Sequence, residues 1–220
     1  MSENDAKPRT PAFKIRDARF VLGAAHPNQF PNLDWPEAAV AGRSNVGKSS
    51  LLNMLLQRKK LVKVSRTPGR TRQINFFAVN EGFHLVDLPG YGYAKAPGSE
   101  RKQWFELIRR YLSDRPQLKI IVLLLDIRRE PSAEDLGALE FFRDAGVPCL
   151  VVLTKADKLA LQQRRKQVSS VAKRLRLDPG DCLVASAEKG WGREEIWNSL
   201  LCFLSPESTD AAPAGALPPG

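Results

Sequence analysis

Cysteine is scarce in this chain of 220 residues, and long apolar runs are missing. The three cysteines, Cys149, Cys182 and Cys202, lie in apolar segments without metal-site spacing, and an odd, unpaired set fits a reducing cytosol. No apolar run is long enough to span a bilayer, and the polar residues 1–5, which include acids, are unlike a signal peptide. We therefore expect a soluble, cytoplasmic protein with no membrane partner.

Acidic residues are also missing between residues 38 and 80, although nine Lys or Arg occur there. The whole chain carries a net charge of +10, which suits an acidic polymer as partner, while solubility alone is the plain alternative. The excess is concentrated in one part of the chain. This uneven distribution favours a binding surface there over a uniformly solvated one.

The strongest positive signal is the loop GRSNVGKS at residues 42–49, which matches the pattern G-x-x-x-x-G-K-[ST]. Such a loop wraps the phosphates of a nucleoside triphosphate with its backbone N–H groups. Lys48 would reach the β- and γ-phosphates, and the Ser49 hydroxyl would ligate Mg²⁺. An apolar run at 38–41 precedes the loop and a helical segment at 50–56 follows it, which argues against a chance match in a glycine-bearing loop.

Strands alternate with helices along the rest of the chain. Strands at 74–79 and 83–86 should be antiparallel neighbours, because residues 80–82 form a tight turn. The remaining expected strands are 119–126, 149–153 and 182–185, with an extra N-terminal strand at 18–22, and the expected helices are 99–113, 132–146, 159–177 and 194–204. This order predicts an α/β fold of three layers, with a mostly parallel six-stranded sheet that contains one antiparallel strand. Residues 1–14 and 206–220 should be disordered, which leaves one domain at 15–205.

Three further motifs would complete a nucleotide site. In DLPG, Asp87 ends an apolar strand, where it would hold Mg²⁺ through water, and the Gly90 N–H would meet the γ-phosphate. In TKAD, the carboxylate of Asp157 can accept hydrogen bonds from N1–H and the exocyclic amine of guanine, and the stem of Lys155 can lie along the ring. The pair 186–187 can offer backbone N–H groups to guanine O6. Each motif alone is weak evidence for a nucleotide site, because turns and polar strand ends are common. The prediction rests on the occurrence of all three in this order after the loop at 42–49.

Together these segments resemble a translation-factor-type P-loop GTPase, and specifically the EngB family of ribosome-assembly GTPases. The resemblance covers about residues 18–205, and it is carried by five segments: GRSNVGKSSLLN at 42–53, TPGRTRQINFF at 67–77, DLPGYGYAKAP at 87–97, TKADK at 154–158 and SAEKG at 186–190. The resemblance implies a Mg²⁺-dependent GTPase that acts as a switch in large ribosomal subunit assembly and is required for normal cell division and septation. It implies GTP or GDP and the large subunit or its precursor as partners of a monomer.

The motifs and the resemblance assign the site residues. The catalytic candidates are Lys48, Thr71 and Gly90, and the metal ligands are Ser49 and Thr71, with Asp87 acting through water. The GTP-binding candidates are Gly42, Arg43, Ser44, Asn45, Val46, Gly47, Lys48, Ser49, Gly69, Arg70, Thr71, Arg72, Gln73, Asp87, Leu88, Pro89, Gly90, Thr154, Lys155, Ala156, Asp157, Ala185, Ser186 and Ala187.

Two positions depart from the general GTPase pattern. Thr154 stands where Asn is usual, which matches the family's own variant, so guanine specificity stays with Asp157. Tyr91 stands where many GTPases have a Gln that orients water, and a phenol cannot do this as a carboxamide does. Intrinsic hydrolysis should therefore be slow and wait for an activator, a cation or the ribosome. By the resemblance, Asn45 is a candidate K⁺ ligand, with a turn or capping role as the alternative.

The acid-free segment is the expected RNA contact, because it adjoins the segment that the γ-phosphate orders. Its candidates are Lys59, Lys60, Lys63, Arg66 and Arg72. A second basic cluster follows the TKAD motif, and a solvated helix face explains it equally well: Arg164, Arg165, Lys166, Lys173, Arg174 and Arg176. The alternative function is a nucleotide-dependent regulator that acts directly on division proteins without ribosome binding. A metabolic NTPase or kinase is disfavoured, because the chain has no substrate domain or lid-sized insertion.

Overall fold

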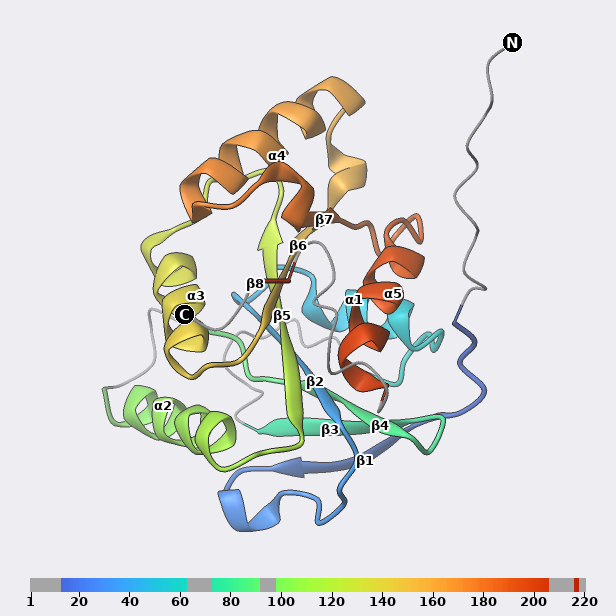
Figure 1. Ribbon diagram of the computed structural model, residues 1–220, viewed down its shortest axis with the longest axis vertical. Helices are drawn as coiled ribbons and strands as arrows, with labels where there is room; N and C mark the ends of the chain where they lie inside the picture. Colours follow the sequence, from blue (N-terminus) through green and yellow to red (C-terminus); the bar gives the residue numbers. More distant parts are fainter. Residues whose placement is uncertain (1–12, 63–72, 92–97, 206–215, 218–220) are drawn as a thin grey trace.

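Apolar segments that alternate with amphipathic helices build a mixed sheet with helices on both faces (Figure 1). The computed structural model describes residues 13–62, 73–91, 98–205 and 216–217. Its strands are β1 (Ala18–Ala24), β2 (Glu37–Gly42), β3 (Ile74–Val79), β4 (Phe83–Asp87), β5 (Leu118–Asp126), β6 (Cys149–Thr154), β7 (Cys182–Val184) and β8 (Ala216–Leu217). Its helices are α1 (Lys48–Leu55), α2 (Gly98–Ser113), α3 (Ala133–Asp144), α4 (Leu161–Leu175) and α5 (Arg193–Leu204), with short 3₁₀ turns η1 (Pro27–Gln29), η2 (Ala156–Lys158) and η3 (Pro179–Asp181).

The strand order is β1-β3-β4-β2-β5-β6-β7, and β8 pairs with β6. Among the first seven strands, β3 alone runs opposite to the others and is antiparallel to both β1 and β4, because the turn at Asn80 and Glu81, both with positive φ, reverses the chain into β4. The central strands are parallel, with Val40 opposite Asp87 and Asp126 opposite Thr154. Parallel register brings the carboxyl ends of β2, β4, β5 and β6 to one edge of the sheet, where a ligand site is expected.

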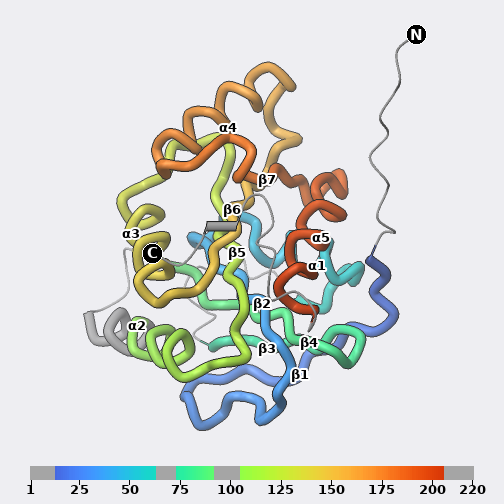
Figure 2. Tube along the Cα trace, in the orientation of Figure 1, coloured from blue at the N-terminus to red at the C-terminus, as the bar shows by residue number. Residues whose placement is uncertain are grey.

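Two apolar layers cover the sheet. One face packs against α2, α3 and α4 through side chains such as Ile108, Phe142 and Val171. The other packs against α1 and α5, with Leu52 and Trp197 fully buried. Figure 2 shows the same division, with α2, α3 and α4 following one another along one side and α1 and α5 on the other. The predicted three-layer α/β fold is therefore confirmed, and β1 is the extra N-terminal strand. No helix in the described ranges is long and apolar enough to cross a membrane.

A buried polar cluster fixes the start of β2, at the end of the strand away from the glycine-rich loop. Glu37 is fully buried and accepts hydrogen bonds from Arg115 Nη2 at 2.6 Å and Tyr111 Oη at 2.9 Å. Burial opposes the charge of Glu37, but the hydrogen bonds from Arg115 and Tyr111, with the His84 ring nitrogen 3.4 Å away, outweigh burial and lower the pKa of this carboxyl. The strand that carries the loop is thus anchored by an ionised carboxylate.

Each predicted helix and strand begins and ends within two residues of an observed one. The two ends of the chain show the departures. The sequence predicts disorder for residues 1–14, but the ring of Phe13 packs 4.7 Å from that of Trp197 and 5.9 Å from that of Phe83. The Asn80 side chain also holds the next residues, because its amide donates to Lys14 O at 2.9 Å and its oxygen accepts from Arg16 N at 2.7 Å.

The tail predicted to be disordered contains strand β8. Its two residues pair with Cys149 and Leu150, which lie just beyond the part of β6 that β7 covers. β6 therefore offers an open stretch of edge, and two apolar residues are enough to occupy it. The rest of the predicted tail, 206–215 and 218–220, lies outside the described residues, as do residues 1–12.

Candidate functional site

The glycine-rich loop turns sharply between β2 and α1. Gly47 caps the helix with φ +107°, and Asn45 has φ 66°, a left-handed conformation that asparagine tolerates better than most residues. A Cβ on Gly42 would lie 2.8 Å from Val46 Cγ1, so the tight turn needs glycine there. The loop therefore leads directly into the first turn of α1, whose free backbone N–H groups can bind an anion.

The DLPG segment after β4 lies against this loop. Leu88 N donates to Val40 O at 3.0 Å, and Ser44 N donates to Tyr91 O at 3.3 Å. A Cβ on Gly90 would come within 3.3 Å of Ser44 N and Gly42 O, so the close approach of the two segments leaves little room for a side chain there. The structure thus brings the predicted phosphate-binding segments 42–49 and 87–90 together.

Lys48 and Asp87 face each other where these segments meet. The ammonium and the carboxylate form an ion pair, and their side chains are only 12% and 4% exposed. Asn75 Nδ2 lies 3.5 Å from the other oxygen of Asp87. Ser49, the predicted metal ligand, follows Lys48 in the first turn of α1 and is partly buried. The site therefore presents a cation for phosphate beside hard oxygen donors of the kind that Mg²⁺ prefers.

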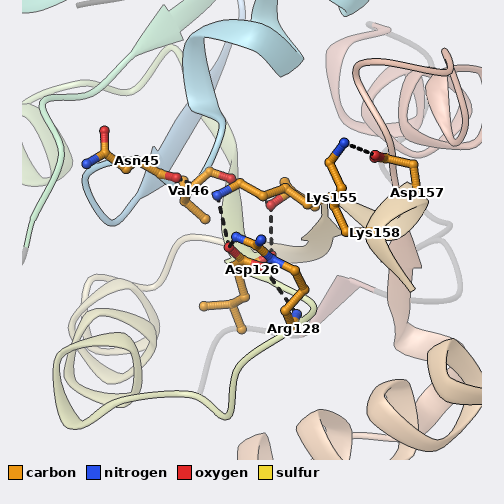
Figure 3. A network of polar contacts seen from close by, with 9 residues as sticks. Asn45, Val46, Asp126, Arg128, Lys155, Asp157 and Lys158 are labelled. Carbon is orange, nitrogen blue, oxygen red and sulfur yellow. Dashed lines mark hydrogen bonds and ion pairs between the residues drawn. The ribbon is translucent and has the colours of Figure 1, made fainter. Parts of the chain in front are cut away.

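The TKAD motif ties the end of β6 to the glycine-rich loop. Thr154 Oγ1 lies 2.7 Å from Val46 O and 3.1 Å from Leu125 O, and its proton can be donated to either carbonyl. Lys155 Nζ donates to Asn45 O at 2.7 Å and to Asp126 Oδ2 at 2.9 Å (Figure 3). The threonine that replaces the usual asparagine is thus a structural link between the two loops.

Asp126 is a site residue that the sequence analysis does not assign. Besides Lys155, it binds the Arg128 side chain through two hydrogen bonds, at 2.9 Å to Nε and 2.7 Å to Nη2, and it accepts a third from Arg128 N at 3.1 Å (Figure 3). Burial disfavours its charge, but the hydrogen bonds from Arg128 and Lys155 outweigh burial and lower the pKa of the carboxyl well below its usual range. The only signal in the sequence is a single acid at the end of the apolar run 119–126.

Asp157 is held in place as a hydrogen-bond acceptor. Lys158 Nζ lies 2.8 Å from Oδ2, Ser186 Oγ donates to Oδ1 at 2.6 Å, and these two contacts lower the pKa of the carboxyl to about 2. Its side chain is 6% exposed and Ser186 is fully buried. An ionised carboxylate only accepts hydrogen bonds, which suits the two donors on one edge of guanine.

The segment after β7 completes this part of the site. Ala156 N donates to Ala185 O at 3.1 Å, which joins it to the TKAD motif. Ser186 and Trp191 exchange two backbone hydrogen bonds of 3.1 Å, closing a loop that carries Ala187. Gly192 has φ +78°, and a Cβ there would lie 2.3 Å from Val184 O, so the return of this loop requires glycine.

Tyr91 is engaged away from any water-orienting role. Its hydroxyl donates to Asp135 Oδ1 at 2.9 Å, and the residue is 8% exposed. Burial and the neighbouring Asp135 raise the pKa of the phenol well above its usual range. Asp135 also accepts hydrogen bonds from Ser132 N and Oγ, both at 2.9 Å, in the capping box of α3. Tyr91 thus joins the DLPG segment to the start of a helix.

Some predicted site residues are not placed by the structure. Gly69, Arg70, Thr71 and Arg72, together with Lys63 and Arg66, lie outside the described residues. Gln73 is exposed just before β3, and Lys59 and Lys60 are exposed after α1. Their proposed roles in binding GTP, Mg²⁺ or RNA stay predictions.

Comparison with known proteins agrees with this geometry. A family model described as a 50S ribosome-binding GTPase matches residues 37–155. A probable GTP-binding protein EngB of Geobacter metallireducens is 45% identical, over 92% of this chain and 99% of that protein. One from Alkaliphilus metalliredigens is 46% identical, over 85% of this chain and 90% of that protein.

Solved structures share the fold. The crystal structure of a probable EngB protein matches with a TM-score of 0.63 and 24% identity, over 76% of this chain and 98% of that one. NFeoB from S. thermophilus, solved with GDP, AlF₄⁻ and K⁺, matches with a TM-score of 0.58 and 21% identity, over 81% of this chain and 65% of that one. The sequence relatives, the family model and the joined nucleotide motifs lead to one conclusion: the chain belongs to the EngB family of P-loop GTP-binding proteins and is a GTPase.

Proposed function

We propose that this GTPase is a Mg²⁺-dependent switch in the assembly of the large ribosomal subunit and is required for normal cell division and septation. The observation that carries the proposal is the combination of a joined GTPase site with the acid-free residues 38–80, which carry nine cations, six of them outside the nucleotide motifs. RNA is the acidic polymer in a ribosomal particle, and cations facing its phosphates supply most of a sequence-independent affinity. The description of the matching family model, a 50S ribosome-binding GTPase, supports the same partner.

The residues present fit a Mg²⁺ ion. Asp87 supplies a nearly buried carboxylate beside Lys48, and Ser49 supplies a hydroxyl in the first turn of α1. We propose Ser49 and Thr71 as direct ligands and Asp87 as a ligand through water. When bound, Mg²⁺ would neutralise charge on the β- and γ-phosphate oxygens. Lys48 would leave Asp87 and bind these oxygens, while the Gly90 N–H would donate to the γ-phosphate.

We propose slow intrinsic hydrolysis because the residue after DLPG offers nothing that orients water. The Tyr91 hydroxyl is committed to Asp135, and its raised pKa keeps it protonated. An activator, a cation or the ribosome would then supply what the chain lacks. We propose Asn45 as the K⁺ ligand, since it is exposed in the loop. Its backbone carbonyl accepts a hydrogen bond from Lys155. Its positive φ also gives it a turn role, so the two roles coexist at one residue.

Binding of GTP would restrain the segment 63–73 through Thr71 and present Lys63, Arg66 and Arg72 to RNA. With GDP this restraint would be missing. Each contact between these side chains and an RNA phosphate would then also have to offset the conformational entropy lost when the segment 63–73 becomes ordered. Co-sedimentation with purified large subunits tests this, with a non-hydrolysable GTP analogue, with GDP and without nucleotide. We expect tighter binding with the analogue and weaker binding as salt rises.

The matched variant in this experiment replaces Lys63, Arg66 and Arg72 together by Ala. We expect weaker subunit binding with nearly unchanged nucleotide affinity. Equal binding of the original protein in the GTP and GDP states would contradict the switch. No binding in any state would contradict the ribosomal role and favour a regulator that acts directly on division proteins.

A further inference from the structure

The second basic cluster lies on and beside α4, in a part of the chain without acids. Between Asp157 and Asp178 there is no Asp or Glu, although seven cations occur there. Two of them are engaged: Lys158 binds Asp157 and Glu188, and Arg164 stacks on the ring of Trp191 at 4.5 Å. The other five are exposed, and none forms an ion pair within the described ranges: Arg165, Lys166, Lys173, Arg174 and Arg176.

Helix α2 shows what a solvated basic face looks like in the same molecule. Arg109 Nη2 lies 2.8 Å from Glu106, and Arg110 lies 3.2 Å from Glu106 and 3.4 Å from Asp114. Such spacings of three and four residues let a surface helix neutralise its own charge. Because α4 has cations of the same kind but no such acids, its face stays strongly positive.

A groove lies beside these cations, between α3 and α4, which are neighbours on one side of the sheet (Figure 1). It has a volume of about 490 Å³, and Lys173, Arg174 and Arg176 line it together with Arg143 of α3. Two acids also line it, Glu130 and Glu140. Glu130 is already engaged, since it accepts hydrogen bonds from Ser170 Oγ at 2.8 Å and Gln167 Nε2 at 3.3 Å. The groove therefore has an excess of cations.

Arg176 places a cation at the edge of the groove in a backbone conformation that is unfavourable for arginine. It follows the last turn of α4 with φ 58°, the left-handed conformation that glycine or asparagine usually supplies at this position. An arginine adopts it at a conformational cost. Such a residue at the edge of a basic groove points to a binding role.

We propose that the α3–α4 groove and the exposed cations of α4 bind the phosphate backbone of RNA. This proposal rests on the proposed function, in which the partner is a ribosomal particle. From residue 165 to residue 176 the cations extend along roughly 16 Å of helix, at ~1.5 Å per residue. That length covers several phosphates of one strand, which follow each other at ~3.4 Å along a nucleic-acid helix.

An acidic protein partner fits the groove less well. The centre of a protein interface usually contains exposed apolar or aromatic anchors. Three leucines line this groove: Leu139 and Leu175 are each only 2% exposed because they are packed in the core, and Leu136 is partly buried against the same core. What the groove offers to a partner is therefore mainly charge and hydrogen-bond donors, which suit phosphate oxygens.

The test compares two variants that remove the same charge from different helices. Lys173→Gln with Arg174→Gln removes two unpaired cations of α4, and Arg109→Gln with Arg110→Gln removes two paired cations of α2. Each protein, bound to a non-hydrolysable GTP analogue, is titrated against purified large subunits and against protein-free large-subunit RNA at several salt concentrations. GTP affinity and circular dichroism establish that both variants are folded.

We expect the α4 variant to bind particles and RNA about tenfold more weakly, with the slope of log affinity against log salt reduced by about 1 to 2. The α2 variant should stay within about twofold of the original protein. Equal binding of the two variants would overturn the proposal and leave the ribosomal role intact. A loss confined to particles, with RNA binding absent or unchanged, would also overturn it and assign the groove to an acidic ribosomal protein. If the original protein binds neither particle nor RNA, the proposed function fails as well.

Discussion

The two halves of the nucleotide site are built differently. In the base half, Asp157 is ionised, held by Ser186 and Lys158, and enclosed by a loop whose return depends on Gly192. In the phosphate half, the charged groups are paired with each other, because Lys48 binds Asp87. With the proposed assignment of these residues, guanine would bind to contacts that are already formed, whereas the phosphates would have to displace the Lys48–Asp87 ion pair. This difference suggests that the base half, whose contacts are already formed, recognises the base of the nucleotide. The phosphate half, whose ion pair must rearrange, responds to the number of phosphates.

Asp157→Asn tests the base half of the site, and we expect it to have the largest effect. The amide replaces an acceptor by a mixed donor and acceptor, which leaves a guanine donor unpaired and suits xanthine better. We expect GTP binding to weaken by a few kcal/mol, on the order of a hundredfold or more, and XTP binding to improve. Titration with both nucleotides measures the exchange. Unchanged GTP affinity would remove Asp157 from base recognition.

Lys48→Ala and Ser49→Ala test the phosphate half of the site. They separate the contribution of the Lys48 charge from that of Mg²⁺ binding. Lys48→Ala removes the ammonium group that would bind the phosphate oxygens, and it leaves Asp87 without its cation. GTP affinity should therefore fall by roughly a hundredfold. The second loosens Mg²⁺, with a smaller loss. Excess Mg²⁺ in a nucleotide-binding assay should partly restore only Ser49→Ala. Equal rescue of both variants, or of neither, would contradict the assignment.

Asp126→Asn tests the connection between the halves. The side chain keeps its shape but loses the charge that holds Lys155 against the Asn45 carbonyl. We expect affinity for GTP and GDP to fall together by roughly tenfold, since the link supports the loop and not the γ-phosphate. Arg128→Gln is the matched control, because it removes the other partner of Asp126 and keeps the bond to Lys155. A loss for GTP alone would assign Asp126 to the phosphate half.

Tyr91→Phe should have the smallest effect on catalysis. The hydroxyl binds Asp135 and stays protonated, so its removal should leave single-turnover GTP hydrolysis within a few-fold of the original rate. It should cost about 1 to 2 kcal/mol of stability, because one hydrogen bond to a carboxylate is lost. Chemical unfolding measures this cost. A loss of ~100-fold in the rate would show that the phenol is catalytic.

The phosphate and base motifs can be predicted from the sequence because each requires particular residue types at fixed spacings and in a particular backbone conformation. A Cβ would collide at Gly42 and would be crowded at Gly90, and φ is positive at Gly47, so these positions favour glycine and the motif shows in the sequence. Asp126 was not assignable, since an acid at the end of a buried strand suits many roles until Lys155 is seen beside it. Phe13 belongs to the same class. Its partners Phe83 and Trp197 are far away in sequence, so only tertiary packing reveals that it is ordered.

The strand order has a consequence for how the chain is made. β2 lies between β4 and β5, so residues 37–42 find their second neighbour only when residues 118–124 have been synthesised. Pairings of such large sequence separation form slowly, and an unpaired strand edge is prone to aggregate while it waits. Asp157 and Ser186, the proposed base-binding residues, are synthesised later still. If GTP needs them to bind, a nascent fragment that ends before residue 186 should fold no better when the nucleotide is present.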